Sequence, residues 1–121
     1  MKYYLIVFIL ITSSICSCNR YSNNILVKNS SNRVVDSVIV LGNVDCKSLK
    51  FSKILQKSTR KGYLANCQAN NQGDGSFNVK VYIGKEVFES RLGYFTNGVS
   101  IFKNIEIEIK NDYNIVSHIS Y

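Results

Sequence analysis

The stretch "GSFNVKVYIG", residues 75–84, contains the clearest structural pattern in the chain. Its apolar and more polar side chains alternate strictly: Phe77, Val79, Val81 and Ile83 against Asn78, Lys80 and Tyr82. Successive side chains of a β-strand point to opposite faces, so this period of two predicts a strand with one face buried. Residues 70–75 come just before it and are rich in Asn and Gly, which tolerate the positive φ angles of a tight turn. We therefore expect a turn followed by a half-buried strand.

The same two-residue period recurs along most of the chain. Further candidate strands, bounded by turn residues, lie near residues 25–28, 34–41, 49–51, 61–68, 87–89, 93–96, 105–110 and 113–119. Asn97-Gly98 is a strong hairpin turn signal. No apolar period of 3.6 residues persists beyond about three turns, and only residues 49–57 offer a competing helical turn.

These strands predict the fold class. About seven to nine short strands with regularly spaced turns favour an all-β, antiparallel β-sandwich, either immunoglobulin-like or transthyretin-like. The chain has 121 residues, enough for one domain with a modest core. Its 45% hydrophobic and 12% aromatic content is typical of a folded protein and excludes a disordered one.

The first residues have the order of a secretion signal. A short positive start, Met1 and Lys2, precedes an apolar run at residues 3–11 and the small polar residues 12–14. A membrane-spanning helix needs about 20 apolar residues, and this run is about half that length. We therefore expect an N-terminal signal helix that is removed, rather than a permanent transmembrane anchor.

The tetrapeptide Ile15-Cys16-Ser17-Cys18 resembles the lipobox of bacterial lipoproteins, which places an aliphatic residue three positions before a cysteine and a small residue just before it. Cys18 fits that pattern, whereas Cys16 would follow the bulky Ile15. The resemblance implies that the Cys18 thiolate receives a diacylglyceryl group and that the signal is cut just before it. Two or three fatty chains such as palmitate then hold a protein durably on a membrane. An ordinary cleaved signal with a free product is the alternative.

The resemblance divides the chain into a signal peptide at 1–17, a lipidated cysteine and tether at 18–24, and a β-sandwich domain at 25–121. The ending "SSICSC", the asparagine-rich tether and a compact β domain are similar to small lipoproteins of Bacteroidota. The segments "VKNSSNRVVDSVIV", "GSFNVKVYIG" and "GYFTNG" resemble the Ig-like domains of such proteins. Surface-exported members carry acidic residues just after the cysteine, and residues 19–24 contain none. We therefore expect a periplasm-facing position on the outer membrane of the cell envelope.

Two further cysteines, Cys46 and Cys67, remain in the mature chain. An even pair in an oxidising compartment is a candidate disulfide, and two reduced core thiols are the alternative. A catalytic cysteine is not expected, because the sole histidine, His118, lies in a strand-like segment near the end of the chain. No HExxH, nucleophile-elbow, P-loop or CxxC motif occurs, so the sequence predicts no enzyme, no metal site and no cofactor.

The net charge of +7 is concentrated in one segment. Between Cys46 and Gly73 there are six basic residues and no acidic one: Lys47, Lys50, Lys53, Lys57, Arg60 and Lys61. Such a stripe suits an acidic protein, anionic lipid or nucleic acid. Nucleic acid is not expected, because the glycine and aromatic patterns of its recognition modules are missing. A solvated face that keeps the protein soluble is the simplest alternative.

Three functional hypotheses remain open. The favoured one is a membrane-anchored, non-catalytic binding or structural module of the envelope. The second is an inhibitor or immunity-type protein whose basic face, Lys47 to Lys61, docks an acidic protein partner. The third is an unrecognised enzyme, which requires a polar cluster in a pocket.

Two other side-chain sets have simple interpretations. Glu106 and Glu108 alternate with three isoleucines and are expected on the outward polar face of a strand. The tyrosines are expected in the core and at its rim, although five of them could instead line a carbohydrate surface: Tyr63, Tyr82, Tyr94, Tyr113 and Tyr121.

Overall fold

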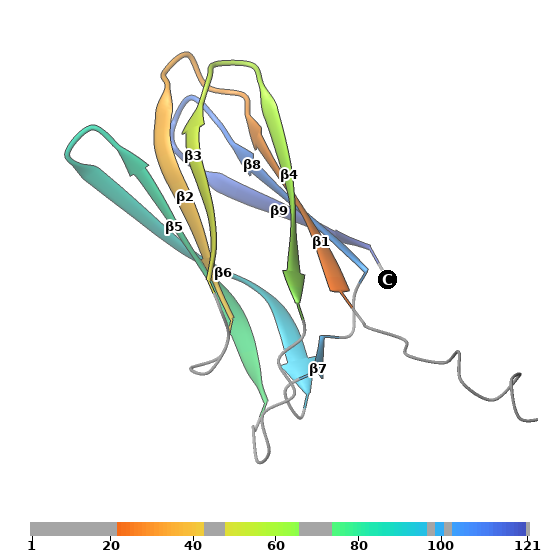
Figure 1. Cartoon of the computed structure of the whole chain (residues 1–121). Coiled ribbons are helices and arrows are strands. Elements are labelled where there is room, and N and C mark those ends of the chain that lie inside the picture. The colour runs from red at the N-terminus through yellow and green to blue at the C-terminus, as the bar shows by residue number, and fades with distance from the viewer. Residues whose placement is uncertain (1–21, 43–47, 66–73, 97–98, 101–102, 121) are drawn as a thin grey trace, which may run out of the picture.

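A computed structural model describes residues 22–42, 48–65, 74–96, 99–100 and 103–120. Within these ranges the chain forms nine strands and no helix: β1 (Ser22–Asn29), β2 (Val35–Leu41), β3 (Leu49–Ile54), β4 (Thr59–Ala65), β5 (Gly75–Ile83), β6 (Glu86–Thr96), β7 (Val99–Ser100), β8 (Asn104–Ile109) and β9 (Ile115–Ser120). They form two sheets (Figure 1). The prediction of an all-β chain is confirmed, and the expected signal helix lies outside the described residues.

The two sheets have different strand orders. One has four strands in the order β4-β1-β8-β9, and the other has five in the order β3-β2-β5-β6-β7. The described pairs are antiparallel except β1 and β8, which run parallel with Leu26 opposite Glu106. The expectation of a purely antiparallel sandwich is therefore wrong for this pair. A hairpin forces its strands to run antiparallel, but β1 and β8 are far apart in sequence and no turn joins them.

The inward faces of both sheets share one hydrophobic core. The inward side chains predicted for β5 are all buried, and so are the isoleucines of β8: Phe77, Val79, Val81 and Ile83, with Ile105, Ile107 and Ile109. Burying one such aliphatic side chain contributes about 1.5–3 kcal/mol. The period-two patterns of these two strands are therefore confirmed, and they supply a large part of the stabilising apolar area.

The alternation is interrupted where β2 pairs with β3. Phe51 and Ile54 are both buried although they are three positions apart, and the same holds for Val35 and Val38 on the neighbouring strand. The register between the two strands stays constant, so both strands shift their inward face at the same level. Lys53, with a φ of 47°, lies in this stretch of β3. The three-residue spacing of the buried residues of β3 is the reason that residues 49–57 have an apolar spacing that also suits a helical turn.

Strand β6 is longer than predicted. It joins two segments, residues 87–89 and 93–96, that the sequence analysis assigned to separate strands. Gly93 has a φ of 65°, which glycine adopts without steric cost, so the strand continues through this irregular point. Strands β6 and β7 then pair antiparallel on either side of Asn97-Gly98, which agrees with the hairpin signal there.

Asn29, the last residue of β1, is a fully buried polar side chain. Its Nδ2 group donates to the carbonyl oxygens of Arg33 (2.8 Å), Ile54 (3.1 Å) and Leu55 (3.2 Å). Its Oδ1 accepts from the backbone N–H (3.1 Å) and the hydroxyl (2.7 Å) of Ser31. One amide therefore joins the end of β1 to the β1–β2 loop and to the β3–β4 turn.

We expect Asn29→Leu to lower the free energy of unfolding by about 2–4 kcal/mol, because several buried carbonyls lose their donor. Urea denaturation would measure this as a lower midpoint with an unchanged slope. Asn32→Ala is the matched control: its side chain is exposed, and the change should stay within about 0.5 kcal/mol. Equal losses in the two variants would contradict the role assigned to the buried amide.

Candidate functional site

The basic stripe of the sequence lies on β3, β4 and the turn between them, along a side of the sandwich; the two strands are consecutive but do not pair with each other. Strands β3 and β4 are outer strands of different sheets and lie next to each other (Figure 1). Lys47 lies outside the described residues, and the other five predicted cations are exposed on this basic hairpin, residues 49–65: Lys50, Lys53, Lys57, Arg60 and Lys61. The hairpin has no acidic residue, and none of the five forms an ion pair with a described carboxylate.

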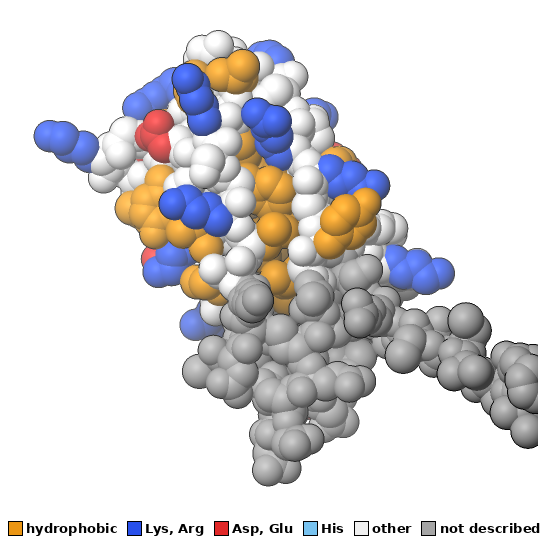
Figure 2. All heavy atoms as spheres, in the orientation of Figure 1, with side chains coloured by type: hydrophobic (Ala, Val, Ile, Leu, Met, Phe, Trp, Pro, Cys, Tyr) orange, Lys and Arg blue, Asp and Glu red, His pale blue; other side chains and the backbone are white. Residues whose placement is uncertain are grey.

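An apolar seam separates the two strands of the basic hairpin. Figure 2 shows hydrophobic side chains between β3 and β4, with Lys and Arg side chains around them. Gly62 of β4 packs against β3 so closely that an added Cβ would lie 2.9 Å from Phe51 and 3.0 Å from Leu49. Lysines on edge strands prevent pairing with other chains. The charges along both strands therefore have a structural explanation, and this explanation does not apply to the turn between them.

The turn of the basic hairpin exposes an apolar side chain. Leu55 is 51% exposed, and its carbonyl oxygen accepts from Asn29 Nδ2, from the Ser58 backbone N–H (3.2 Å) and from the Ser58 hydroxyl (2.7 Å). Lys53 and Lys57 stand on either side of it with φ angles of 47° and 55°. The left-handed region is unfavourable for a side chain such as lysine. The backbone of the turn is thus held firmly while Leu55 faces solvent.

Neighbouring loops brace this turn. Gln56 Nε2 donates to the Asn32 carbonyl (2.9 Å), and Lys57 Nζ donates to the Ser30 carbonyl (2.5 Å). The Asn32 backbone N–H in turn donates to Asn111 Oδ1 in the β8–β9 turn (2.8 Å). Three loops from both sheets are therefore connected at this end of the sandwich. The sequence analysis missed this arrangement, because nothing in the pattern of residues 55–58 distinguishes it from an ordinary polar turn.

Arg33, at the same end of the sandwich, differs from the cations of the basic hairpin because its guanidinium forms an ion pair with a described carboxylate. Its Nη1 donates to Glu86 Oε2 (3.2 Å) and to the Tyr113 hydroxyl (2.9 Å), and its guanidinium lies 5.5 Å from the centre of the Tyr113 ring. The hydrogen bond to Tyr113 and then the carboxylate of Glu86 raise the pKa of Arg33. Tyr113 also stacks on Phe88 with ring centres 4.9 Å apart. This group therefore stabilises the structure rather than offering free charge.

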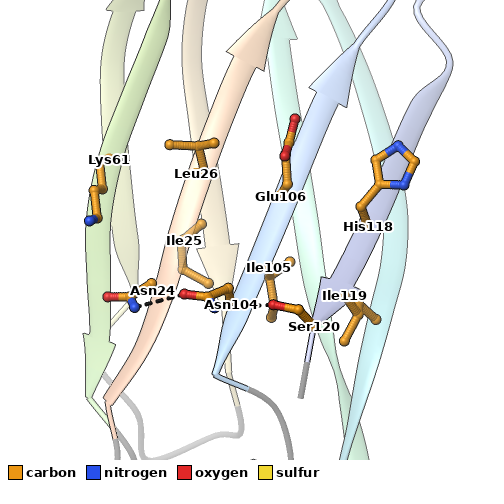
Figure 3. Close-up of a pocket in the computed structure, with 10 residues that line it drawn as sticks. All are labelled: Asn24, Ile25, Leu26, Lys61, Asn104, Ile105, Glu106, His118, Ile119 and Ser120. Carbon is orange, nitrogen blue, oxygen red and sulfur yellow. Dashed lines mark hydrogen bonds between the residues drawn. The ribbon is translucent and has the colours of Figure 1, made fainter.

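A second candidate surface is an open hollow of about 320 Å³ on the outer face of the four-stranded sheet (Figure 3). Two rows of side chains cross the strands there: Lys61, Leu26, Glu106 and His118, and then Asn24, Asn104 and Ser120. In the second row, Asn24 Nδ2 donates to Asn104 Oδ1 (2.8 Å), and Asn104 Nδ2 donates to Ser120 Oγ (3.1 Å). The hollow is therefore a shallow, mainly apolar surface, with a row of amides at one side that partly satisfy one another.

The acidic and imidazole groups of this sheet do not form a catalytic set. Glu106 and His118 stand opposite each other on neighbouring strands, and both side chains are described, but no hydrogen bond joins them. His118 lies exposed on β9, an outer strand, as predicted. Glu106 and Glu108 lie on the outward face and alternate with buried isoleucines, which confirms that prediction. Within the described ranges no three His, Cys, Asp or Glu side chains lie together as a metal site.

Glu108 has its own partners on β1 and the loop that follows it. Its Oε1 accepts from the Ser30 hydroxyl and lies 3.4 Å from Lys28 Nζ. The Ser30 hydrogen bond, and then the charges of Lys28 and Lys110, lower the pKa of Glu108. Because the pKa of Glu108 is lowered on folding, its stabilising contribution is fully present at pH values above the pKa that Glu108 has in the unfolded chain. It is lost as the pH falls through the lower pKa of the folded protein.

We expect Ser30→Ala to raise the pKa of Glu108 toward that of a free glutamate, because the hydroxyl makes the largest contribution. An NMR titration of the Glu108 side-chain carboxyl carbon would measure the shift. Lys28→Ala is the comparison, since it removes a charge but keeps the hydrogen bond and should raise the pKa less. A larger effect of Lys28→Ala would show that charge, not the hydroxyl, dominates.

The described tyrosines do not share a surface. Tyr63 lies on the outer face of the four-stranded sheet, with Lys61 Nζ 5.6 Å from its ring centre. Tyr82 lies in β5 of the other sheet, Tyr94 donates to Asp74 Oδ2 (2.7 Å), and Tyr113 packs beside Arg33. Tyr121 lies outside the described residues. The structure thus gives no support to a carbohydrate surface lined by these tyrosines together.

Several predicted residues lie outside the described part of the chain. These are the lipobox cysteine Cys18 and its neighbour Cys16, and the candidate disulfide partners Cys46 and Cys67. In the part of the chain that the structure describes, there is no helix of the length and apolar character needed to cross a membrane.

The fold and the surfaces above define a small two-sheet β protein with a basic hairpin at one side. An NMR structure of a protein from Eubacterium rectale is similar to it, with a TM-score of 0.54 and 11% sequence identity. The similarity covers 86% of this chain and 93% of that one. At this identity it shows the fold alone. No protein-family model matches the chain, and no curated protein matches it.

Proposed function

We propose that the chain is an envelope lipoprotein whose β-sandwich is a non-catalytic binding module, held on a membrane through Cys18. The signal-like start and the tetrapeptide Ile15-Cys16-Ser17-Cys18 support the anchor. Strand β1 begins at Ser22, three residues before the predicted domain boundary. Only residues 19–21 then separate Cys18 from the sheet, a distance of about 14 Å at full extension. The sandwich would stand close to the lipid surface, and the lack of acid in residues 19–24 favours the periplasmic face of the outer membrane.

The observation that carries the binding role is the set of exposed, unpaired cations on the basic hairpin. The described carboxylates Glu86, Glu89 and Glu108 pair with cations elsewhere, on Arg33, Lys80 and Lys28. The positive surface of the hairpin is therefore not neutralised from within the described part of the chain, and it suits an acidic partner. An inhibitor or immunity-type role, in which the hairpin enters an acidic cleft, is the narrower form of the same proposal.

We infer that the sandwich is transthyretin-like rather than immunoglobulin-like. In a constant-type immunoglobulin domain the first two strands belong to the same sheet. Here β1 and β2 lie in different sheets, and β1 pairs with β4 and β8. This strand order supports the transthyretin-like alternative of the two that the sequence left open.

Labelling with radioactive palmitate tests the anchor. We expect label on the wild-type protein and on Cys16→Ser, because Cys16 leaves with the signal, and no label on Cys18→Ser. Cys16→Ser is the matched control, since it changes a cysteine two positions away. Equal labelling of Cys18→Ser would overturn the lipoprotein proposal.

A disulfide between Cys46 and Cys67 would close the basic hairpin at the ends of its two strands. Cys46 precedes β3 and Cys67 follows β4, and Leu49 at the start of β3 packs against Gly62 of β4. These neighbouring strand ends support the pair. In the chain-entropy model a loop of this size stabilises the folded state by about 3 kcal/mol.

Thiol alkylation of the protein isolated from the envelope tests this pair. We expect Cys46 and Cys67 to react with maleimide only after reduction. We also expect Cys46→Ser to lower the free energy of unfolding by about 3 kcal/mol in the oxidised state. Two freely reactive thiols in the native, unreduced protein would refute the disulfide.

A further inference from the structure

We propose that the turn of the basic hairpin is the point at which a partner is recognised, with Leu55 packing against apolar side chains of an acidic protein segment. Lys53 and Lys57, on either side of Leu55, would contact carboxylates beside those apolar side chains. This inference rests on the proposed binding function.

Leu55 has the properties of an interface anchor. It is a large apolar side chain, 51% exposed, on a backbone fixed by the buried amide of Asn29 and by Ser58. Gln56 and Lys57 brace the same turn against the β1–β2 loop. Because the backbone that carries Leu55 is already held in place, binding would order little more than the side chain itself, so less of the free energy of its burial is offset by lost conformational freedom.

The two lysines on either side of Leu55 are the second argument. Lys53 and Lys57 both have positive φ angles, a conformation that glycine adopts without steric cost. The turn therefore uses lysine at two positions where the backbone favours glycine. Backbone strain of this kind concentrates at functional sites, where the side chain itself is needed. Here the side chains place two positive charges on either side of one apolar group.

The charge around the turn points to an acidic partner. No acidic residue occurs between Ser48 and Ala65. Among nearby carboxylates, Glu86 and Glu108 are paired with Arg33 and Lys28. Asp36, which stands opposite Lys53 on β2, accepts from the Gly84 backbone N–H, and Asp112 accepts from Asn114. Lys57 Nζ donates to the Ser30 carbonyl, but neither Lys53 nor Lys57 forms an ion pair with a described carboxylate, so partners with carboxylates would be attracted and oriented.

The position of the turn favours a protein over a lipid surface. The turn lies at the end of the sandwich where β1 finishes, whereas Cys18 precedes the start of β1 (Figure 1). The eight residues of β1 separate these ends by about 26 Å. A protein anchored at Cys18 would direct Leu55 away from its own membrane.

NMR titration of the full chain carrying Cys18→Ser, in neutral detergent, tests the inference without depending on the lipid. The probe is a short synthetic peptide in which glutamates alternate with leucines. We expect saturable amide shifts at residues 53–58. Lys53→Gly with Lys57→Gly should weaken binding about tenfold, and Leu55→Ser should weaken it to a similar extent.

Both glycine substitutions keep the positive φ angles. Lys57→Gly also removes the hydrogen bond to the Ser30 carbonyl, but those made by Asn29, Gln56 and Ser58 remain to hold the turn. Lys85→Gly is the control for loss of an exposed lysine: it removes one charge from the β5–β6 turn and should leave the affinity within about twofold. Unchanged amide spectra away from the substituted residues verify that each variant is folded.

The inference would be overturned by equal binding of a peptide with serine in place of leucine, by equal binding of a peptide with lysine in place of glutamate, by no saturable binding, or by binding of phosphatidylglycerol vesicles through residues 53–58. Shifts confined to residues 49–52 and 59–65 would also overturn it, but would leave the basic hairpin as the binding element of the proposed function. Palmitate labelling of Cys18 is unaffected by any of these results.

Discussion

The buried amide of Asn29 is the constraint on which this end of the molecule depends. A buried polar side chain is favourable only when its hydrogen bonds are made, and Asn29 makes them to the β1–β2 loop and to the β3–β4 turn. Each of these two loops connects a strand of one sheet to a strand of the other, so the amide fixes how the β3–β4 turn sits on β1. The exposed Leu55 and the two lysines beside it acquire a defined geometry as a result.

The strands with strict alternation were predictable because a strand with one buried face has apolar residues at every second position of the sequence. The patterns around Val79 and Ile107 both became half-buried strands. The parallel pairing of β1 with β8 was not predictable, since the choice of neighbour depends on packing between distant segments. Gly93 shows a further limit: a glycine that suggests the end of a strand can also let the strand continue through an irregular point.

The candidate site was partly predictable in the same way. Five of the cations could be grouped by sequence because they lie on one hairpin, where neighbours in sequence remain neighbours in space. The exposure of Leu55 could not be predicted, because Leu55 follows the apolar Ile54 and either of these two neighbours could have faced the core. Asn29 follows the strand expected at residues 25–28 and is the last residue of β1. Its burial depends on carbonyl groups of Ile54 and Leu55, which only the folded chain brings near.

The place of β1 in its sheet has a mechanical consequence. Strand β1, the first strand of the described chain, is an inner strand, bonded to β4 on one side and to β8 on the other. A pull on Ser22 along the strand, with the far end of the sandwich held, would load both ladders in shear. Many hydrogen bonds would then have to break together, whereas an outer strand such as β9 can be peeled away bond by bond. The sheet order therefore places the mechanically resistant strand where force would enter the domain.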